Sequence, residues 1–170
     1  MIKENMEKAL NEQINKELFS AYLYQAMSAH ASHEGLPGIA TWMDVQAKEE
    51  MFHARKIYDY IDEQSGKVIL KAIEQPDSEF ASVKDMFEKT LKHEQFVTKS
   101  IHELVALARK ENDYATEIFL QWFVTEQVEE ENTANELLDR INLVGDKGNG
   151  LYMIDKELSA RSFTEPAGEE

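Results

Sequence analysis

Four glutamates stand in the middle of apolar stripes, where a charged residue needs a compensating partner. Between the glycines and prolines that punctuate the chain, apolar residues recur every three or four positions, which is the spacing of one face of an α-helix. Glu50, for example, stands seven residues after Met43 and seven before Ile57, and His53 follows one turn later. Each of four such stripes carries an acid near its centre, and the fourth also carries an amide: Glu17, Glu50, Glu94, and Gln127 with Glu130.

One such glutamate could extend its stem to the surface of a bundle and keep its carboxylate in water. Four together are harder to explain, because two carboxylates 4 Å apart repel by about 4 kcal/mol even at an effective dielectric constant of 20. The nearest basic residues, Lys16, Lys48 and Lys92, are offset toward other helix faces. Metal ions are the remaining source of positive charge. A carboxylate-rich set with one imidazole favours iron or manganese over zinc or copper.

The composition limits which class of protein this can be and which partners it can bind. The chain has 170 residues, 42% apolar and 30% charged, which is typical of one globular domain. A formal net charge of −15 argues against binding to nucleic acids or anionic membranes, although acidity also simply favours solubility. The absence of cysteine excludes disulfides and thiolate metal sites. No apolar run approaches the length of a membrane span, so we expect a cytoplasmic protein.

The elements that position these acids are four long helices. Apolar periodicity predicts them at about residues 6–33, 37–64, 83–111 and 113–143. Residues 66–82 show no helical period. If the second and third helices run parallel, this link must cover about 40 Å, and 17 extended residues reach roughly 55 Å. The fold class is therefore all-α, an up-down four-helix bundle with one long crossover.

Beyond the glycines that end the fourth helix, a short fifth helix is predicted. Leu151, Ile154 and Leu158 recur there at helical spacing, which suits a contact between subunits. We expect one bundle domain over residues 1–163, and a disordered acidic tail over residues 164–170.

The sequence resembles the ferritin superfamily, and within it the bacterial non-haem ferritins, over nearly the whole chain. The motifs that carry the resemblance are Glu17-x6-Tyr24, Glu49-Glu50-Met51-Phe52-His53, His93-Glu94-Gln95, Glu126-Gln127-Val128-Glu129-Glu130, and the late Gly150-Leu151-Tyr152-Met153-Ile154-Asp155-Lys156-Glu157-Leu158. Jointly these motifs are very specific, whereas a lone Glu-x-x-His is weak. Ferritin-like folds hold pairs of iron ions in the bundle core with such residues.

The resemblance implies a di-iron site in which one ion is bound by Glu17, Glu50 and His53. The neighbouring ion would be bound by Glu94 and Glu130, with Glu50 bridging, Gln127 close by and Tyr24 as a redox-active partner. It also implies a third iron site facing an interior cavity, formed by four acids: Glu49, Glu126, Glu129 and Glu130. Without the resemblance, these four acids would be taken for a solvated acidic face.

The fourth helix distinguishes this chain from other relatives. Bacterioferritins and rubrerythrin-like peroxidases have a second Glu-x-x-His, whereas this chain has Gln127-x-x-Glu130, so the second iron lacks an imidazole. Met51 aligns with the haem-ligating methionine of bacterioferritins. Methionine commonly fills gaps in cores and interfaces, and non-haem members resemble the chain here, so no haem is expected.

The expected function is iron storage with ferroxidase activity. Fe(II) would be oxidised by O2 or peroxide at the di-iron site, and the product stored as a ferric oxide inside a homo-oligomeric shell of 24 chains, with the fifth helix at the fourfold contacts. The alternatives are a bacterioferritin-like haem protein, a module that binds metal without oxidising it, and a purely structural helical assembly.

Overall fold

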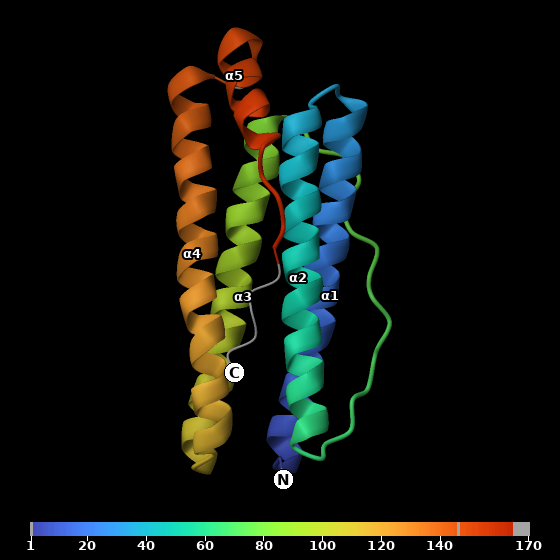
Figure 1. Ribbon diagram of the computed structural model, residues 1–170, viewed down its shortest axis with the longest axis vertical. Coiled ribbons are helices and arrows are strands. Elements are labelled where there is room, and N and C mark those ends of the chain that lie inside the picture. Colours follow the sequence, from blue (N-terminus) through green and yellow to red (C-terminus); the bar gives the residue numbers. More distant parts are fainter. Residues whose placement is uncertain (1, 146, 165–170) are drawn as a thin grey trace.

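The computed structural model describes residues 2–145 and 147–164 as a bundle of long helices with a short helix packed at one end (Figure 1). No strand occurs in this part of the chain. The four long helices match the predicted ranges to within two residues at each end. The helices are α1 (Glu4–His33), α2 (Pro37–Glu63), α3 (Val83–Glu111), α4 (Tyr114–Val144) and α5 (Gly148–Leu158).

The long helices form two antiparallel hairpins, α1 with α2 and α3 with α4. The link between the hairpins runs along the outside of α1 from one end of the bundle to the other, so that α2 and α3 are parallel (Figure 1). Asn11 of α1 fastens the start of this link, because its side chain donates to Lys67 O (2.9 Å) and accepts from Ile69 N (2.6 Å). The predicted bundle with one long crossover is therefore confirmed.

The start and the end of α3 are both set by local sequence. At the start of α3, Ser82 Oγ accepts a hydrogen bond from Asp85 N (3.1 Å), and the Asp85 carboxylate accepts one from Ala81 N (3.0 Å). The first bond satisfies a backbone donor of the first turn, and the second satisfies the N–H group just before the N-cap. Asn112 ends α3 with φ of 53°, the left-handed conformation that asparagine tolerates better than most residues. The predicted separation of the third and fourth helices is therefore confirmed, with the break at Asn112-Asp113.

The fifth helix docks on the N-terminus of α2. Leu36, at the N-cap of α2, supplies no side-chain cap, and Asp155 of α5 accepts a hydrogen bond from Ile39 N instead (2.9 Å). The two helices approach so closely that a Cβ atom on Gly38 would lie 1.6 Å from the backbone oxygen of Asp155. Glycine is required there for steric reasons. A contact of α5 with other subunits stays a prediction.

The interior divides into two apolar clusters with a polar belt between them. One cluster, nearer to α5, includes Met43 and Phe87, and the other, nearer to the N-terminus, includes Leu10 and Ile57. Buried acids and amides from all four long helices lie between these clusters. Within the described residues, every helix is either too short or too polar to span a membrane. The predicted extent of the domain stays a prediction, and residues 165–170 of the proposed tail lie outside the described residues.

Candidate metal centre

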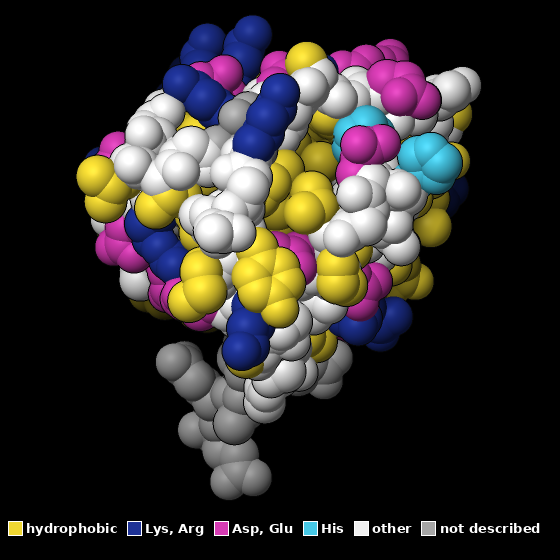
Figure 2. All heavy atoms as spheres, turned by 90° about the horizontal axis from the view of Figure 1, so that it is seen from above, with side chains coloured by type: hydrophobic (Ala, Val, Ile, Leu, Met, Phe, Trp, Pro, Cys, Tyr) yellow, Lys and Arg dark blue, Asp and Glu magenta, His cyan; other side chains and the backbone are white. Residues whose placement is uncertain are grey.

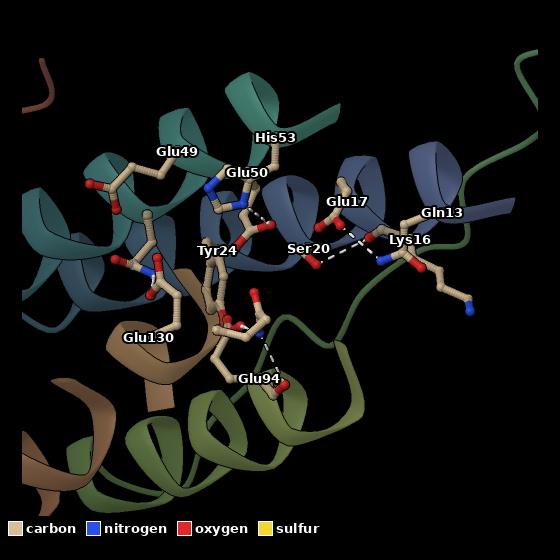
Figure 3. Close-up of polar contacts among 12 residues, drawn as sticks. Gln13, Lys16, Glu17, Ser20, Tyr24, Glu49, Glu50, His53, Glu94 and Glu130 are labelled. Carbon is tan, nitrogen blue, oxygen red and sulfur yellow. Dashed lines mark hydrogen bonds and ion pairs between the residues drawn. The ribbon is translucent and has the colours of Figure 1, made fainter. Parts of the chain in front are cut away.

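The six side chains predicted for the di-iron site meet in the polar belt. Their exposed fractions run from 0% for Glu94 to 9% for Glu130, and Figure 3 shows the carboxylates directed toward one region between the helices. Each long helix contributes, because each carries its acid on the stripe that faces the core. The set consists of Glu17 on α1, Glu50 and His53 on α2, Glu94 on α3, and Gln127 and Glu130 on α4.

Glu17, Glu50 and His53 form the tightest group. One potential ligand atom from each residue lies within 4.8 Å of the other two, and His53 Nδ1 is 3.5 Å from Glu50 Oε2. Glu17 Oε2 and both carboxylate oxygens of Glu50 are buried without a hydrogen-bond partner among the described residues. Buried carboxylate oxygens are strongly destabilising unless they are paired or bind a cation. The group therefore fits a metal ion.

Glu94 and Glu130 lie on the other side of the belt and have more protein partners. Glu94 accepts hydrogen bonds from the Tyr24 hydroxyl and from Gln127 Nε2 (3.1 Å). Glu130 Oε2 accepts one from Gln46 Nε2 (2.8 Å). Among the described residues, these two acids do not join a group of three close ligands.

The carboxyl groups on the two sides of the belt repel one another, and burial and this repulsion together raise the pKa values of Glu50 and Glu94. Burial, followed by repulsion from Glu94, Glu17 and Glu130, raises the pKa of Glu50 well above its usual range. Burial and the neighbouring Glu130 raise the pKa of Glu94 to about 8. These carboxyl groups disfavour their charged forms until a cation is present.

Two nearby groups are kept neutral by their surroundings. Burial lowers the pKa of His53, which keeps the imidazole in the form that ligates metals. Burial, followed by repulsion from Glu94 and Glu50, raises the pKa of Tyr24 well above its usual range. Tyr24 therefore remains a hydroxyl that donates to Glu94.

The acids predicted for the third iron site line one pocket of about 90 Å³. Glu49, Glu126, Glu129 and Glu130 all border it, together with His53 and the segment that follows α5. Arg161, in that segment, donates a hydrogen bond to Glu49 Oε2 (2.6 Å) and lies over the Trp42 ring. Burial raises the pKa of Glu49 to about 7 even though Arg161 opposes the shift. A basic side chain thus occupies the edge of the acidic pocket.

Several of these contacts were not predicted from the sequence. Arg161 stands beyond α5, and we sought a balancing charge only along the helical stripes. Gln46 lies on the apolar stripe of α2 and its burial was expected, but its hydrogen bond to Glu130 was not. His93 belongs to one of the motifs that carry the resemblance, but no role was predicted for it: its Nε2 is 2.7 Å from Ser20 Oγ, and burial lowers its pKa to about 4.

Met51, the position that raised the question of haem, lies away from the polar belt. It is 53% exposed in the single chain and borders an apolar groove of about 680 Å³ between α1 and α2, with Leu18, Phe52 and Ile73. The methionine therefore does not fill a gap in the core of this chain.

Comparisons with known proteins agree with this geometry. The family model for the ferritin-like domain matches residues 7–144. A bacterial non-heme ferritin of Staphylococcus epidermidis is 46% identical over 165 residues, covering 97% of this chain and 99% of that protein. A probable bacterial non-heme ferritin-like protein of Haemophilus influenzae is 43% identical over 158 residues, covering 93% of this chain and 96% of that one.

Solved structures give the same result. An engineered closed form of Archaeoglobus fulgidus ferritin matches with a TM-score of 0.95 and 48% identity, covering 96% of this chain and all of that one. The open-pore ferritin of the same archaeon matches with a TM-score of 0.94 and 48% identity, covering 95% of this chain and all of that one. The resemblance seen in the sequence is confirmed, and the chain belongs to the ferritin family.

Proposed function

We propose that this protein binds Fe(II) in its polar belt, oxidises it to Fe(III), and stores the product as a ferric oxide. The observation that carries the proposal is the group formed by Glu17, Glu50 and His53. Three of its buried carboxylate oxygens have no hydrogen-bond partner in the part of the chain that the structure describes, and they lie beside a neutral imidazole. The similar bacterial proteins named as non-heme ferritins support iron as the cation.

In this proposal, Glu17 and His53 bind the first Fe(II) and Glu50 bridges it to the second. Glu50 suits a bridging role, because neither of its oxygens has a hydrogen-bond partner among the described residues. Each Fe(II) loses one electron, and an oxidant that accepts two electrons, O2 or peroxide, receives both. The protein contributes position and negative charge, which stabilise the higher oxidation state.

Glu94 and Glu130 would bind the second ion, close to Gln127. Their hydrogen bonds with Tyr24, Gln127 and Gln46 make them less available than Glu50, and the second ion has no imidazole ligand. We therefore expect the second ion to be held more loosely. Loose binding suits transfer of the oxidised ion to a mineral.

The pocket bordered by Glu49, Glu126 and Glu129 is our proposal for the third iron site. It shares Glu130 with the di-iron site, which gives the oxidised ion a short route between the two. We further propose a shell of 24 chains in the cytoplasm, with the mineral inside. Apolar side chains are exposed on the single chain, among them Tyr152 and Met153 of α5, and Figure 2 shows apolar side chains at the surface of the end of the bundle that carries this helix. They support association with other copies.

The decisive experiment adds Fe(II) anaerobically and then admits air. The proposal predicts a near-ultraviolet oxo-ferric absorption band and uptake of several iron atoms per chain. Glu50→Ala and His53→Ala should slow the rapid phase by roughly 10- to 100-fold or more. Glu103→Ala is the matched control, because Glu103 is an exposed acid on α3.

Each alternative gives a different result in the same experiment. A module that binds without oxidising would take up stoichiometric iron and develop no oxo-ferric band, and a structural assembly would take up none. A Soret band in the purified protein would indicate haem near Met51. If Glu50→Ala oxidised iron as fast as the unmodified protein, the proposed site would be wrong.

A further inference from the structure

A directed chain of hydrogen bonds approaches Glu17 from the side opposite Glu50. It begins at Lys16, whose Nζ donates to Ser100 Oγ, and it joins α1 to α3. Ser100 Oγ then donates to Gln13 Oε1 (2.5 Å), and Gln13 Nε2 donates to Glu17 Oε1 (2.8 Å). In Figure 3, Glu17 lies between Gln13 and Glu50. Gln13 and Ser100 are 1% and 4% exposed, so water does not compete for these bonds.

The groups at the two ends of this chain fix the direction of its bonds. A metal-binding carboxylate can only accept, so the amide nitrogen of Gln13 must face Glu17 and Gln13 Oε1 faces Ser100. An ammonium group can only donate, so Ser100 Oγ accepts from Lys16 and gives its single hydroxyl hydrogen to Gln13 Oε1. The orientation of a glutamine amide is usually ambiguous, but here its two partners determine it.

The consequence is that the two oxygens of Glu17 are not equivalent. Oε1 is occupied by the Gln13 amide, whereas Oε2 is buried without a hydrogen-bond partner among the described residues. We propose that Gln13, oriented by Ser100 and Lys16, is a positioning residue that makes Glu17 a one-oxygen ligand of the metal held by Glu17, Glu50 and His53. This inference rests on the proposed function of that group.

A one-oxygen ligand leaves a coordination position on the ion free. A carboxylate that binds through both oxygens occupies two positions, whereas catalytic metal sites keep a position open for a reactant. Gln13 would therefore preserve the place at which the oxidant or a water molecule reaches the ion. It would also restrict rotation of the Glu17 carboxylate, so that less freedom is lost when the ion binds.

Cobalt(II) provides a test that does not depend on iron oxidation. Its visible bands weaken as its coordination number rises, and the band due to this site is the one that His53→Ala removes. In Gln13→Met, which has a similar length but no donor, we expect this band to weaken because Glu17 can bind through both oxygens. Affinity should also fall, by roughly 10- to 100-fold, as for other lost outer-shell partners.

The matched control is Gln25→Met, the same substitution on the same helix. Gln25 is exposed and donates to Asp44 Oδ1 (3.1 Å), so its loss should leave the cobalt band unchanged. Ser100→Ala is the second variant: it releases the Gln13 amide without altering it, and should weaken the band by a smaller amount. It also serves if far-ultraviolet circular dichroism shows that Gln13→Met does not fold.

A cobalt band of unchanged intensity in folded Gln13→Met would overturn the proposal, with or without a change in affinity. If Gln13→Met does not fold and Ser100→Ala is used instead, an unchanged cobalt band in folded Ser100→Ala would also overturn the proposal. If His53→Ala removed no cobalt band from the unmodified protein, the proposed metal site itself would fail. The two failures are therefore distinguishable.

Discussion

The side-chain amide of Gln127 donates a hydrogen bond to Glu94 Oε2 over 3.1 Å, linking α4 to α3 in the centre of the bundle. The Tyr24 hydroxyl donates to the other oxygen of the same carboxylate. Hydrogen bonds of this kind favour an ionised carboxylate. Burial and the nearby Glu130 nevertheless raise the pKa of Glu94 to about 8, so desolvation and repulsion outweigh both donors.

This raised pKa predicts that the metal-free protein loses stability as pH rises. Between the ordinary pKa of 4.5 and about 8, Glu94 is ionised in the unfolded chain and protonated in the folded one. Unfolding then releases a proton, so the contribution of Glu94 to the free energy of unfolding falls by up to roughly 1.4 kcal/mol per pH unit. Glu94→Gln should remove this contribution. Denaturant unfolding of both proteins across the window measures the difference.

The control for this titration is Glu103→Gln, an exposed position on the same helix. Its unfolding curves should follow those of the unmodified protein at every pH. Parallel curves for Glu94→Gln and the unmodified protein would contradict the prediction.

Glu50→Gln should stabilise the metal-free protein and abolish its response to metal. Burial and repulsion from Glu94, Glu17 and Glu130 force Glu50 to bind a proton when the metal-free chain folds, which costs free energy at neutral pH. Glutamine is neutral without that cost, so we expect the free energy of unfolding to rise by about 1–3 kcal/mol. Zn(II), which is redox-inert, should stabilise the unmodified protein by about 2.7 kcal/mol at 100 times its dissociation constant. Calorimetry with and without Zn(II) tests both effects, and equal Zn(II) stabilisation of the variant would refute the second.

Gly38→Ala should displace α5. The new Cβ atom would lie 1.6 Å from the backbone oxygen of Asp155, so the two helices must separate and Ile39 N must lose its cap. Loss of a cap costs about 0.5–2 kcal/mol. Asp155→Ala removes the cap without the steric clash and is the companion variant. Hydrogen exchange should show faster opening of the first turn of α2 in both variants, and unchanged exchange there in Gly38→Ala would count against the close approach.

Arg161→Met should strengthen cation binding in the pocket bordered by Glu49, Glu126 and Glu129. The guanidinium group now occupies Glu49 Oε2, one of the oxygens that a metal ion would use. Zn(II) titration in a Glu50→Ala background measures this pocket without the main site. It is best performed at alkaline pH, because the pKa of Glu49 is about 7 and protons would otherwise compete. Unchanged or weaker binding would show that the guanidinium group is not a competitor.

The helices and the buried positions of the acids could be predicted because both depend on periodicity. Apolar spacing placed α1 to α4 to within two residues, and the same stripes singled out Glu17, Glu50, Glu94 and Glu130 as acids facing the core. The link after α2 is long enough to span the bundle, which allowed α2 and α3 to be predicted as parallel. The roles of these acids in binding iron stay predictions.

The contacts that could not be predicted join residues far apart in the chain. Arg161 reaches Glu49 across 112 positions, and Asp155 reaches Ile39 across 116. Neither pair leaves a local pattern, because each depends on how α5 and the segment after it lie against α2. The hydrogen bond from Ser100 to Gln13 also joins two different helices, so it leaves no local pattern either. Periodicity shows which face of a helix is buried, but not which buried polar atoms will meet.

The division into two hairpins has a consequence for how the protein acquires its ions. Glu17, Glu50 and His53 all belong to the first hairpin, whereas Glu94, Gln127 and Glu130 belong to the second. Each hairpin can form early from contacts close in sequence, but joining the two must await closure of the long crossover. In a newly made chain, the first hairpin would thus present its three ligands before the second hairpin has packed against it. Cations bound to these ligands would then favour the packing of the two hairpins, which brings the other three residues to the site.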